Sequence, residues 1–275
     1  MIKNKHITAL DKHSKVLILS CLFALLYSII SFINHYLFRT YALDLGAYTN
    51  ALFDYAHLQW NDSSVFKLKS ENILASHFDL LLIAFSPFYL VFGTYTLLVF
   101  QILFIILGGL GVYAYFNNDN RNQKLALLAT CYFFLFYGVF SAVAYDYHSN
   151  VIAACMIPWF FYSIKKRKLT IASFLIAFMI VAKENIPLWL VFVCLGLAFA
   201  YRSDPRKRNY LLLCALACGI YFVSIILIVM PWISGHNLYP YFHYSQLGSN
   251  YFEAAAYVFT NPLDALNLLF INHSQ

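Results

Sequence analysis

Charged residues are scarce in this chain of 275 residues, because Lys, Arg, Asp and Glu together make up only 11% of it. A typical soluble domain carries about 25%. Hydrophobic residues reach 62%, and the mean hydropathy is +0.67. This composition excludes a soluble enzyme and a disordered chain. It predicts an all-α integral membrane protein, built as a polytopic bundle of spanning helices.

Cysteine is missing from the polar segments, since all six cysteines lie within apolar runs. Neither a disulfide framework nor a zinc site is therefore indicated, and we expect these residues to be small buried hydrophobes. The cluster Gly108, Gly109 and Gly111 follows no strand pattern, so it does not indicate a nucleotide site. Small residues inside an apolar run instead favour close helix packing.

Apolar runs near the 20 residues that a span requires predict about seven spans within one membrane domain, residues 1–275. The expected spans are 16–38, 96–116, 125–144, 151–164, 169–182, 187–201 and 210–233. The run 80–92 is short and contains Pro87, so we expect an interfacial or re-entrant helix there. The remaining expected parts are a cytoplasmic tail (1–15), a long outer loop (39–79) and an outer C-terminal segment (234–275).

Basic residues cluster in the tail 1–15, the run 165–168 and the segment 202–208. The positive-inside rule then predicts a multi-pass protein of the cell (inner) membrane, with a cytoplasmic N-terminus and an extracytoplasmic C-terminus. The net charge of +6 is explained by these anchors, so we expect no nucleic-acid partner. Arg39 follows the first apolar run in place of a small-residue cleavage site, which favours a retained anchor.

Most carboxylates and imidazoles fall on the expected outer face. Asp44 lies in ALDLGAY, His77 and Asp79 lie in ASHFDLL, and Asp146 and His148 lie in YDYHSN. A carboxylate near the bilayer can deprotonate a hydroxyl group, and an imidazole can bind phosphate or a metal. Two acid–histidine pairs beside one membrane surface therefore indicate acid–base or metal chemistry.

Each of these residues also has a structural alternative. Asp44 could cap a helix, and His77 with Asp79 could cap the entry to segment 80–92. Lys183 and Glu184 end an apolar run, so they could pair with each other or face a cavity. Arg39 could hold a phosphate or extend its charged end to the membrane interface.

Four stretches carry a resemblance to a known family: DLGAYTNALFDYA, SHFDLLLIAFSPFYLVFGTYTLLVFQ, VAYDYHSN and VAKENIP. Over residues 36–200 the chain resembles bacterial multi-spanning proteins grouped as domain of unknown function 2079. This resemblance implies a likeness to the C-type glycosyltransferases (GT-C fold) that use polyprenyl-phosphate sugars. In those enzymes an acid in the first outer loop is typically essential, and Asp44 matches its position. His77 with segment 80–92 matches a histidine-containing segment that leads into a juxtamembrane helix.

The chain departs from that pattern in two respects. Leu43 and Leu45 flank Asp44 where the enzymes often have paired acids, with Asp54 as a possible second acid. The enzymes are also usually longer, so the chain looks like the N-terminal part of the family fold. It would then be either an active enzyme or a truncated or inactive relative.

The resemblance implies transfer of a sugar from polyprenyl phosphate to a lipid or glycan acceptor at the outer face. Asp44 would be the catalytic residue, and His77, Lys183, Arg39 and His148 would bind the phosphate. Asp79, Asp146 and Glu184 would line the site or share a divalent metal.

A transporter or a lipid-binding membrane protein is the alternative, because segments 80–92 and 151–164 are short and interrupted by proline. A scaffold subunit without chemistry is a third reading.

Overall fold

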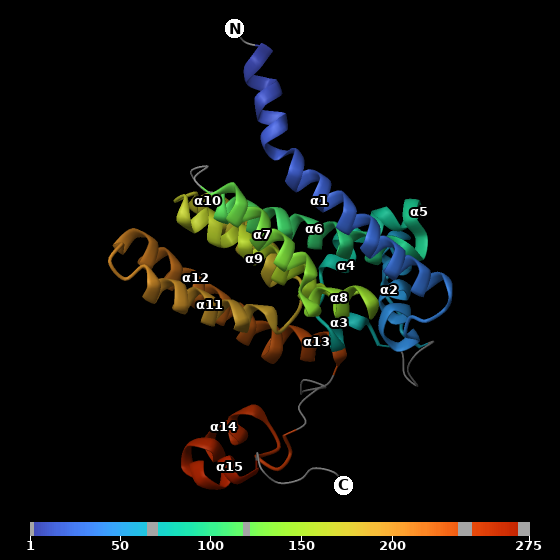
Figure 1. Ribbon diagram of the computed structural model, residues 1–275. Helices are drawn as coiled ribbons and strands as arrows, with labels where there is room; N and C mark the ends of the chain where they lie inside the picture. Colours follow the sequence, from blue (N-terminus) through green and yellow to red (C-terminus); the bar gives the residue numbers. More distant parts are fainter. Residues whose placement is uncertain (1–2, 65–70, 118–121, 236–243, 269–275) are drawn as a thin grey trace.

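The computed structural model describes residues 3–64, 71–117, 122–235 and 244–268, and every regular element in them is helical (Figure 1). This confirms the expected all-helical class. The elements are α1 (Lys3–Tyr36), η1 (Ala42–Gly46), α2 (Ala47–Ala56), α3 (Ile73–Ser76), α4 (Leu81–Phe85), η2 (Ser86–Phe88), α5 (Tyr89–Phe92), η3 (Gly93–Tyr95), α6 (Thr96–Phe116), α7 (Gln123–Leu135), α8 (Tyr137–Ala144), α9 (Ser149–Lys165), α10 (Leu169–Ile180), α11 (Ile186–Ala200), α12 (Pro205–Ser224), η4 (Ile225–Val229), α13 (Met230–Ser234), α14 (Tyr251–Thr260) and α15 (Pro262–Leu268).

Three helical stretches are long and apolar enough to cross a membrane: His13–Tyr36, Leu81–Phe116 and Pro205–Ser234. A fourth is present if α7 and α8, bent by 41° at Phe136, are counted as one span. The other apolar helices, α10 and α11, are shorter. All seven expected spans are therefore helical, while three or four meet the length criterion.

The expected outer loop 39–79 is partly helical and packs into the bundle. Leu45, Tyr48, Leu52 and Tyr55 are buried at helical spacing along η1 and α2. Helix α2 packs against α4 and α5, which are the short helices of segment 80–92. Gly93, with a φ of 55°, follows α5 and separates this segment from the long helix α6. The run 80–92 is thus a series of short helices that precedes α6, with a change of backbone conformation at Gly93.

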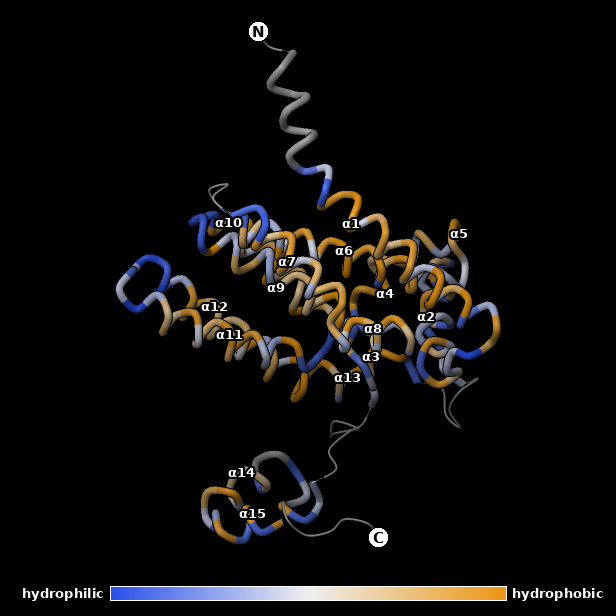
Figure 2. Tube along the Cα trace, viewed as in Figure 1, coloured by the Kyte–Doolittle hydropathy of each residue, from blue (hydrophilic) through white to orange (hydrophobic). Residues whose placement is uncertain are grey.

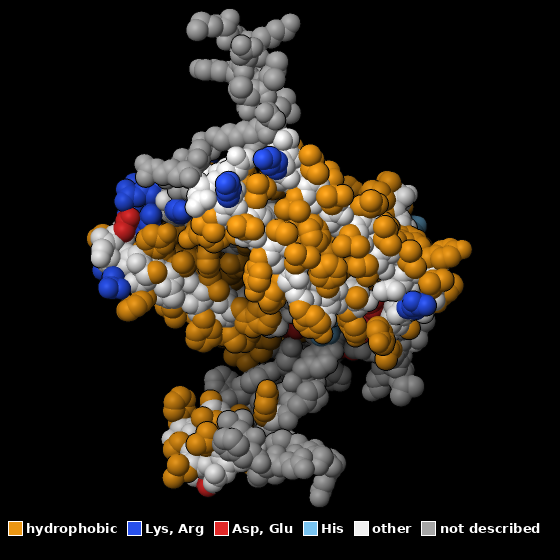
Figure 3. Space-filling model, in the orientation of Figure 1, with side chains coloured by type: hydrophobic (Ala, Val, Ile, Leu, Met, Phe, Trp, Pro, Cys, Tyr) orange, Lys and Arg blue, Asp and Glu red, His pale blue; other side chains and the backbone are white. Residues whose placement is uncertain are grey.

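The bundle has two distinct ends, because α9, α10, α11 and α12 alternate in direction. We call the end with turns 165–168 and 201–205 the basic end, and the end with segments 39–64, 71–80, 145–149 and 181–185 the polar end. Figure 3 shows Lys and Arg side chains gathered at the basic end, beside a broad hydrophobic belt. Figure 2 shows the same division along the chain, with hydrophilic turns joining hydrophobic helices.

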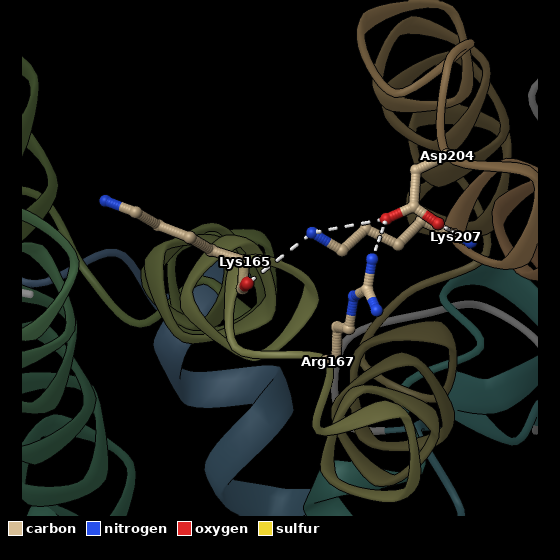
Figure 4. Close-up of polar contacts among 4 residues, drawn as sticks. All are labelled: Lys165, Arg167, Asp204 and Lys207. Carbon is tan, nitrogen blue, oxygen red and sulfur yellow. Dashed lines mark hydrogen bonds and ion pairs between the residues drawn. The ribbon is translucent and has the colours of Figure 1, made fainter.

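One acidic residue joins the two turns of the basic end. Asp204 caps α12 and accepts a hydrogen bond from Nη2 of Arg167 at 2.8 Å (Figure 4). Nζ of Lys207 lies 3.9 Å from the same carboxylate and donates to the carbonyl oxygen of Lys165 at 3.5 Å. These contacts connect the α9–α10 turn to the start of α12.

Glycines let α6 approach its neighbours closely, as the sequence pattern predicted. A Cβ atom on Gly108 would lie 2.9 Å from both Cβ and the carbonyl oxygen of Cys155 on α9. A Cβ atom on Gly109 would overlap the ring of Phe134 on α7. Distances below 3.0 Å require a shift, and at Gly108 the obstacle includes the backbone of α9, so α6 needs glycine there.

We expect Gly108→Ala to destabilise the bundle by about 1–3 kcal/mol, because the added methyl group pushes α6 away from the backbone of α9. Gly196→Ala is the matched control, since a Cβ atom there meets nothing within 4 Å. Thermal unfolding in detergent measures both variants. Equal melting temperatures for the two would contradict this packing.

Candidate functional site

The buried amide of Gln101 holds the α8–α9 segment of the polar end. Gln101 lies in the second turn of an apolar helix, α6, and is 1% exposed. Its Nε2 donates to the carbonyl oxygens of Ala142 at 3.1 Å and Asp146 at 2.9 Å. Its Oε1 accepts from the backbone N–H of His148 at 2.7 Å. This side chain therefore holds the segment from the end of α8 to the start of α9 against α6.

Two of the predicted acids lie together beside this segment. The backbone N–H of Tyr41 donates to Oδ2 of Asp146 at 2.9 Å, which ties the entry of η1 to the segment. The Tyr145 hydroxyl donates to Oδ2 of Asp44 at 2.7 Å, and its ring stacks on Tyr41. Burial raises the pKa of Asp146, and the negative charge of Asp44 raises it further. The charge of one carboxylate thus affects the ionisation of the other.

Asp79 is the most buried of the acids, with no exposed surface. It accepts hydrogen bonds from the backbone N–H of Leu81 at 2.9 Å and from the Tyr147 hydroxyl at 3.3 Å. Burial raises its pKa from the ordinary 3.8 to about 7, although the bonds from Ser149, Leu81 and Tyr147 and the charge of Lys183 oppose the rise. Asp79 therefore exchanges its proton near neutral pH.

His77 and Glu184 connect the α3–α4 corner to the α10–α11 turn. Nδ1 of His77 lies 3.4 Å from Oε1 of Glu184, and the backbone N–H of Phe78 donates to Oε2 at 3.0 Å. Burial opposes ionisation of Glu184, but the bond and charge of His77 and the charge of Lys183 prevail and lower its pKa. Tyr48 packs between the rings of His77 and Tyr147, which brings this corner to Asp79.

Lys183 and His148 complete the cluster. Lys183 is half-buried, and its charge acts on Asp79, Glu184 and His148. Burial lowers the pKa of His148, and the positive charge of Lys183 lowers it further. The imidazole of His148 is therefore favoured in its neutral form at neutral pH, while Lys183 supplies positive charge.

Several buried oxygen atoms near the cluster have no hydrogen-bond partner in the part of the chain that the structure describes. They include Oδ1 of Asp146, Oδ1 of Asn150, Oδ1 of Asn185 and Oγ1 of Thr49. Buried polar atoms are normally satisfied, so unpaired ones point to a water molecule or a ligand. The polar end thus has unused hydrogen-bonding capacity beside its ionisable groups.

Most of the residues singled out from the sequence belong to one network of contacts and charges. That network holds Asp44, His77, Asp79, Asp146, His148, Lys183 and Glu184. Arg39 is exposed, and no contact of its side chain within the described residues joins it to the others. Its role in phosphate binding stays a prediction.

The structural alternatives have mixed outcomes. Asp44 caps no helix, since η1 and α2 begin at residues without side-chain capping bonds. Asp79 does bond the first turn of α4, so the capping interpretation holds for this residue beside its other contacts. Among the described residues, Lys183 forms no close ion pair with Glu184, although its charge lowers the pKa of Glu184. The carboxylate of Glu184 lies against His77 and Phe78.

Three members of the network were not singled out from the sequence: Gln101, Tyr145 and Tyr147. Gln101 had a signal, because a polar side chain inside an apolar run is costly and needs a partner. The tyrosines lay in the YDYHSN patch, where an aromatic belt explained them equally well.

The described residues contain no cluster that could hold a metal ion. No three His, Cys, Asp or Glu side chains among them lie close enough together. Asp44 and Asp146 provide two carboxylates, but His77 and Glu184 form a separate pair. The part of the polar end that the structure describes therefore has no ready set of three metal ligands, and a shared metal at Asp79, Asp146 and Glu184 stays a prediction.

We expect Gln101→Met to lower the free energy of unfolding by about 1–3 kcal/mol, because it leaves the polar atoms of Ala142, Asp146 and His148 buried and unpaired. Thr130→Val is the control, since this buried hydroxyl bonds only Ala126 within its own helix. Thermal unfolding of the two variants in detergent measures the difference. A loss no larger than that of the control would show that Gln101 does not hold the segment.

Asp79 should make stability depend on pH. The folded protein binds the Asp79 proton more tightly than the unfolded chain, so stability falls as pH rises from about 4 through about 7. We expect Asp79→Asn to flatten this fall, because the amide cannot ionise. Unfolding measured between pH 5 and 8 tests this, with the exposed Asp264→Asn as control. An unchanged slope in Asp79→Asn would contradict the buried titration.

Comparison with known proteins identifies a family over most of the chain. Residues 34–275 match the family described as "Predicted membrane protein (DUF2079)". Comparison with curated proteins finds no match, and comparison with solved structures finds none either. The family match covers every helix after α1 and every residue of the polar-end cluster. The chain therefore belongs to the DUF2079 family of predicted membrane proteins.

Proposed function

We propose that this protein is a membrane glycosyltransferase of the C type, or a relative of one, that uses a sugar linked to polyprenyl phosphate. The observation that carries the proposal is the Asp44–Tyr145–Asp146–His148–Lys183 network beside the apolar helices. It combines a half-exposed carboxylate with cationic and imidazole groups, which is what hydroxyl activation and phosphate binding require.

Asp44 would act as the general base. It would take the proton of the acceptor hydroxyl while the oxygen attacks the anomeric carbon of the donor sugar. The bond between this carbon and the phosphate oxygen would break, and polyprenyl phosphate would leave with the bonding electrons. The Tyr145 hydroxyl, bonded to Oδ2 of Asp44, would orient the carboxylate.

The leaving phosphate would be held by Lys183, His77 and His148. Fixed positive charge stabilises a developing phosphate anion, and positioning of both reactants supplies a large share of such a barrier. Asp146, Asp79 and Glu184 would line the site and hold its elements in place through their bonds to Tyr41, Leu81 and Phe78. No step is assigned to a metal ion.

The proposal includes seven spans and a fixed orientation. Helices α9, α10 and α11 would cross the membrane beside the longer spans, with the basic end in the cytoplasm. The positive-inside rule supports this orientation. The polar end would then face the outer leaflet of the cell membrane, where the polyprenyl carrier presents its sugar to a lipid or glycan acceptor.

Transport of a substrate or lipid is the second candidate, and broken apolar helices favour it. The stretch Leu81–Phe116 contains a positive φ at Gly93, and the α7–α8 pair bends by 41°. Transporters build binding sites at such breaks. The variant Asp44→Cys, at a half-exposed position of the polar end, separates the two functions. It should react with an impermeant thiol reagent from both sides in a transporter, and from the outer side alone in an enzyme.

We expect Asp44→Asn and His77→Ala to lose sugar transfer, since the first removes the base and the second removes a phosphate ligand. The rate should fall by roughly 100-fold or more for Asp44→Asn. Mass spectrometry of co-purified lipids measures binding, and transfer from polyprenyl-phosphate sugars measures activity. Wild type should retain a polyprenyl phosphate or its glycoside, and His77→Ala should be depleted of it.

Asp264→Asn is the matched control, because this exposed acid lies in α15 outside the cluster. It should transfer sugar and retain lipid like wild type. Bulk phospholipid alone in every sample, together with equal transfer rates for Asp44→Asn and wild type, would overturn the proposal.

A further inference from the structure

Helices α14 and α15 form a pair that follows the bundle in the chain, and Asn261 joins them (Figure 1). Among the described residues, the main contacts of each helix are with the other. The two helices are 10 and 7 residues long. Isolated helices shorter than about 12–15 residues are marginal in water, and most helical stability comes from packing of an apolar face. This pair therefore needs a surface against which it can bury its apolar side.

The large apolar side chains of the pair are exposed around its turn. Phe259 is 85% exposed and Leu263 is 75% exposed, and they lie on either side of Asn261. Val258 and Leu266 are exposed as well. Figure 3 shows hydrophobic side chains on the face of this pair that is in view. Large apolar side chains gathered on a surface indicate a contact with another molecule or with a membrane.

The polar side of α14 is occupied by its own hydrogen bonds. The backbone N–H of Glu253 donates to Oδ1 of Asn250 at 3.0 Å, and Nδ2 of Asn250 donates to Oε1 of Glu253 at 2.9 Å. The hydroxyl and the backbone N–H of Ser249 donate to Oε2 of Glu253 at 2.6 and 2.9 Å. These bonds lower the pKa of Glu253. They form a capping box that fixes the start of α14 and keeps its carboxylate ionised.

Helix α14 is amphipathic. Each residue turns the helix by about 100°, so Glu253 and Thr260 fall on one side while Val258 and Phe259 flank the opposite side. On α15, Asp264 and Asn267 likewise fall on one side, three residues apart. Short amphipathic helices with one apolar side are typical of elements that lie in the plane of a membrane surface.

The preceding helix keeps the pair beside the membrane. Helix α13 ends the apolar stretch Pro205–Ser234 and packs against α3 at the polar end. Its Trp232 is 81% exposed, and tryptophan is enriched where spanning helices meet the headgroups. Residues 235–250 join α13 to α14 and could reach at most about 60 Å if fully extended. The pair is thus tethered to the membrane surface at the polar end.

The charge of this region indicates which kind of membrane surface it suits. Residues 234–275 contain no Lys or Arg, and Glu253 and Asp264 are their only acidic residues. Anionic lipids attract basic segments, so this pair gains no electrostatic attraction from them. A contact made by apolar insertion alone suits a zwitterionic phospholipid.

We propose that α14 and α15 lie in the membrane–water interface at the polar end, with Val258, Phe259, Leu263 and Leu266 inserted among zwitterionic phospholipids. Interfacial helices bury their apolar side about 5–10 Å into the boundary between headgroups and acyl chains. Glu253 and Asp264 remain on the water side. This inference does not depend on the proposed sugar transfer.

The test is photo-crosslinking of the full chain in phosphatidylcholine proteoliposomes. The variants are Phe259→benzoylphenylalanine and the matched control Tyr257→benzoylphenylalanine, because these two aromatic side chains leave α14 about 160° apart. Mass spectrometry of the irradiated protein identifies what is joined to each position. We expect a phosphatidylcholine adduct at position 259 that is lacking at position 257.

The same experiment distinguishes the other possible occupants of this apolar side. A crosslink from position 259 to the polar end of the bundle would show that the pair closes over the cluster, and a crosslink to a second copy would show an interface between chains. Either result would overturn the proposal. Equal lipid adducts at positions 257 and 259, no adduct at position 259, or an adduct formed only when phosphatidylglycerol is present would overturn it as well.

Hydrogen exchange of the amides of residues 253–268 in the same proteoliposomes is a second measurement. Phe259→Asp should speed this exchange about tenfold, the factor expected when one large apolar side chain loses its burial. Phe259→Leu is the matched control, because it stays apolar and should exchange like wild type. Equal exchange rates in wild type and Phe259→Asp would contradict insertion of Phe259.

Discussion

The polar end depends on the requirement that buried backbone groups be hydrogen-bonded where water is excluded. The chain between α8 and α9 leaves its helices beside an apolar core, and Gln101 supplies the bonds that this segment lacks. Asp146, Tyr147 and His148 are held as a consequence, and Asp146 in turn fixes the entry of η1 through Tyr41. Thus the position of Asp44 follows indirectly from one amide inside α6.

Electrostatics then divides the cluster into groups with different proton affinities. Burial favours the protonated form of Asp79 and the neutral form of His148, whereas His77 and Lys183 favour the ionised form of Glu184. Separated proton affinities among close titratable groups are typical of acid–base sites, although structural networks produce them as well. In the proposed sugar transfer, the half-exposed Asp44 would be the base and the positive charge of Lys183 would bind the phosphate.

The two ends of the bundle have different physical roles. The basic end is held together by Asp204, which lies between Arg167 and Lys207. The polar end carries carboxylates and imidazoles that are costly near a bilayer and are held by specific bonds. Helix α6 joins the two ends of the bundle, since Gln101 lies near its polar end and Asn117 follows its last residue at the basic end. Gly108 and Gly109 let this helix pack closely on α9 and α7.

Composition and apolar runs were sufficient to predict a helical membrane protein, the helices in every expected span and the close packing at Gly108, because these depend on residue type and local spacing. The family was also recognisable from short motifs such as DLGAY and YDYHSN. The helices η1 and α2 were less predictable, since burial of α2 against α4 and α5 is a tertiary contact. The contacts that join Asp44 to Tyr145 and His77 to Glu184 link residues about a hundred positions apart. Such pairings depend on how α6, α9 and α10 pack in space, and no local pattern encodes them.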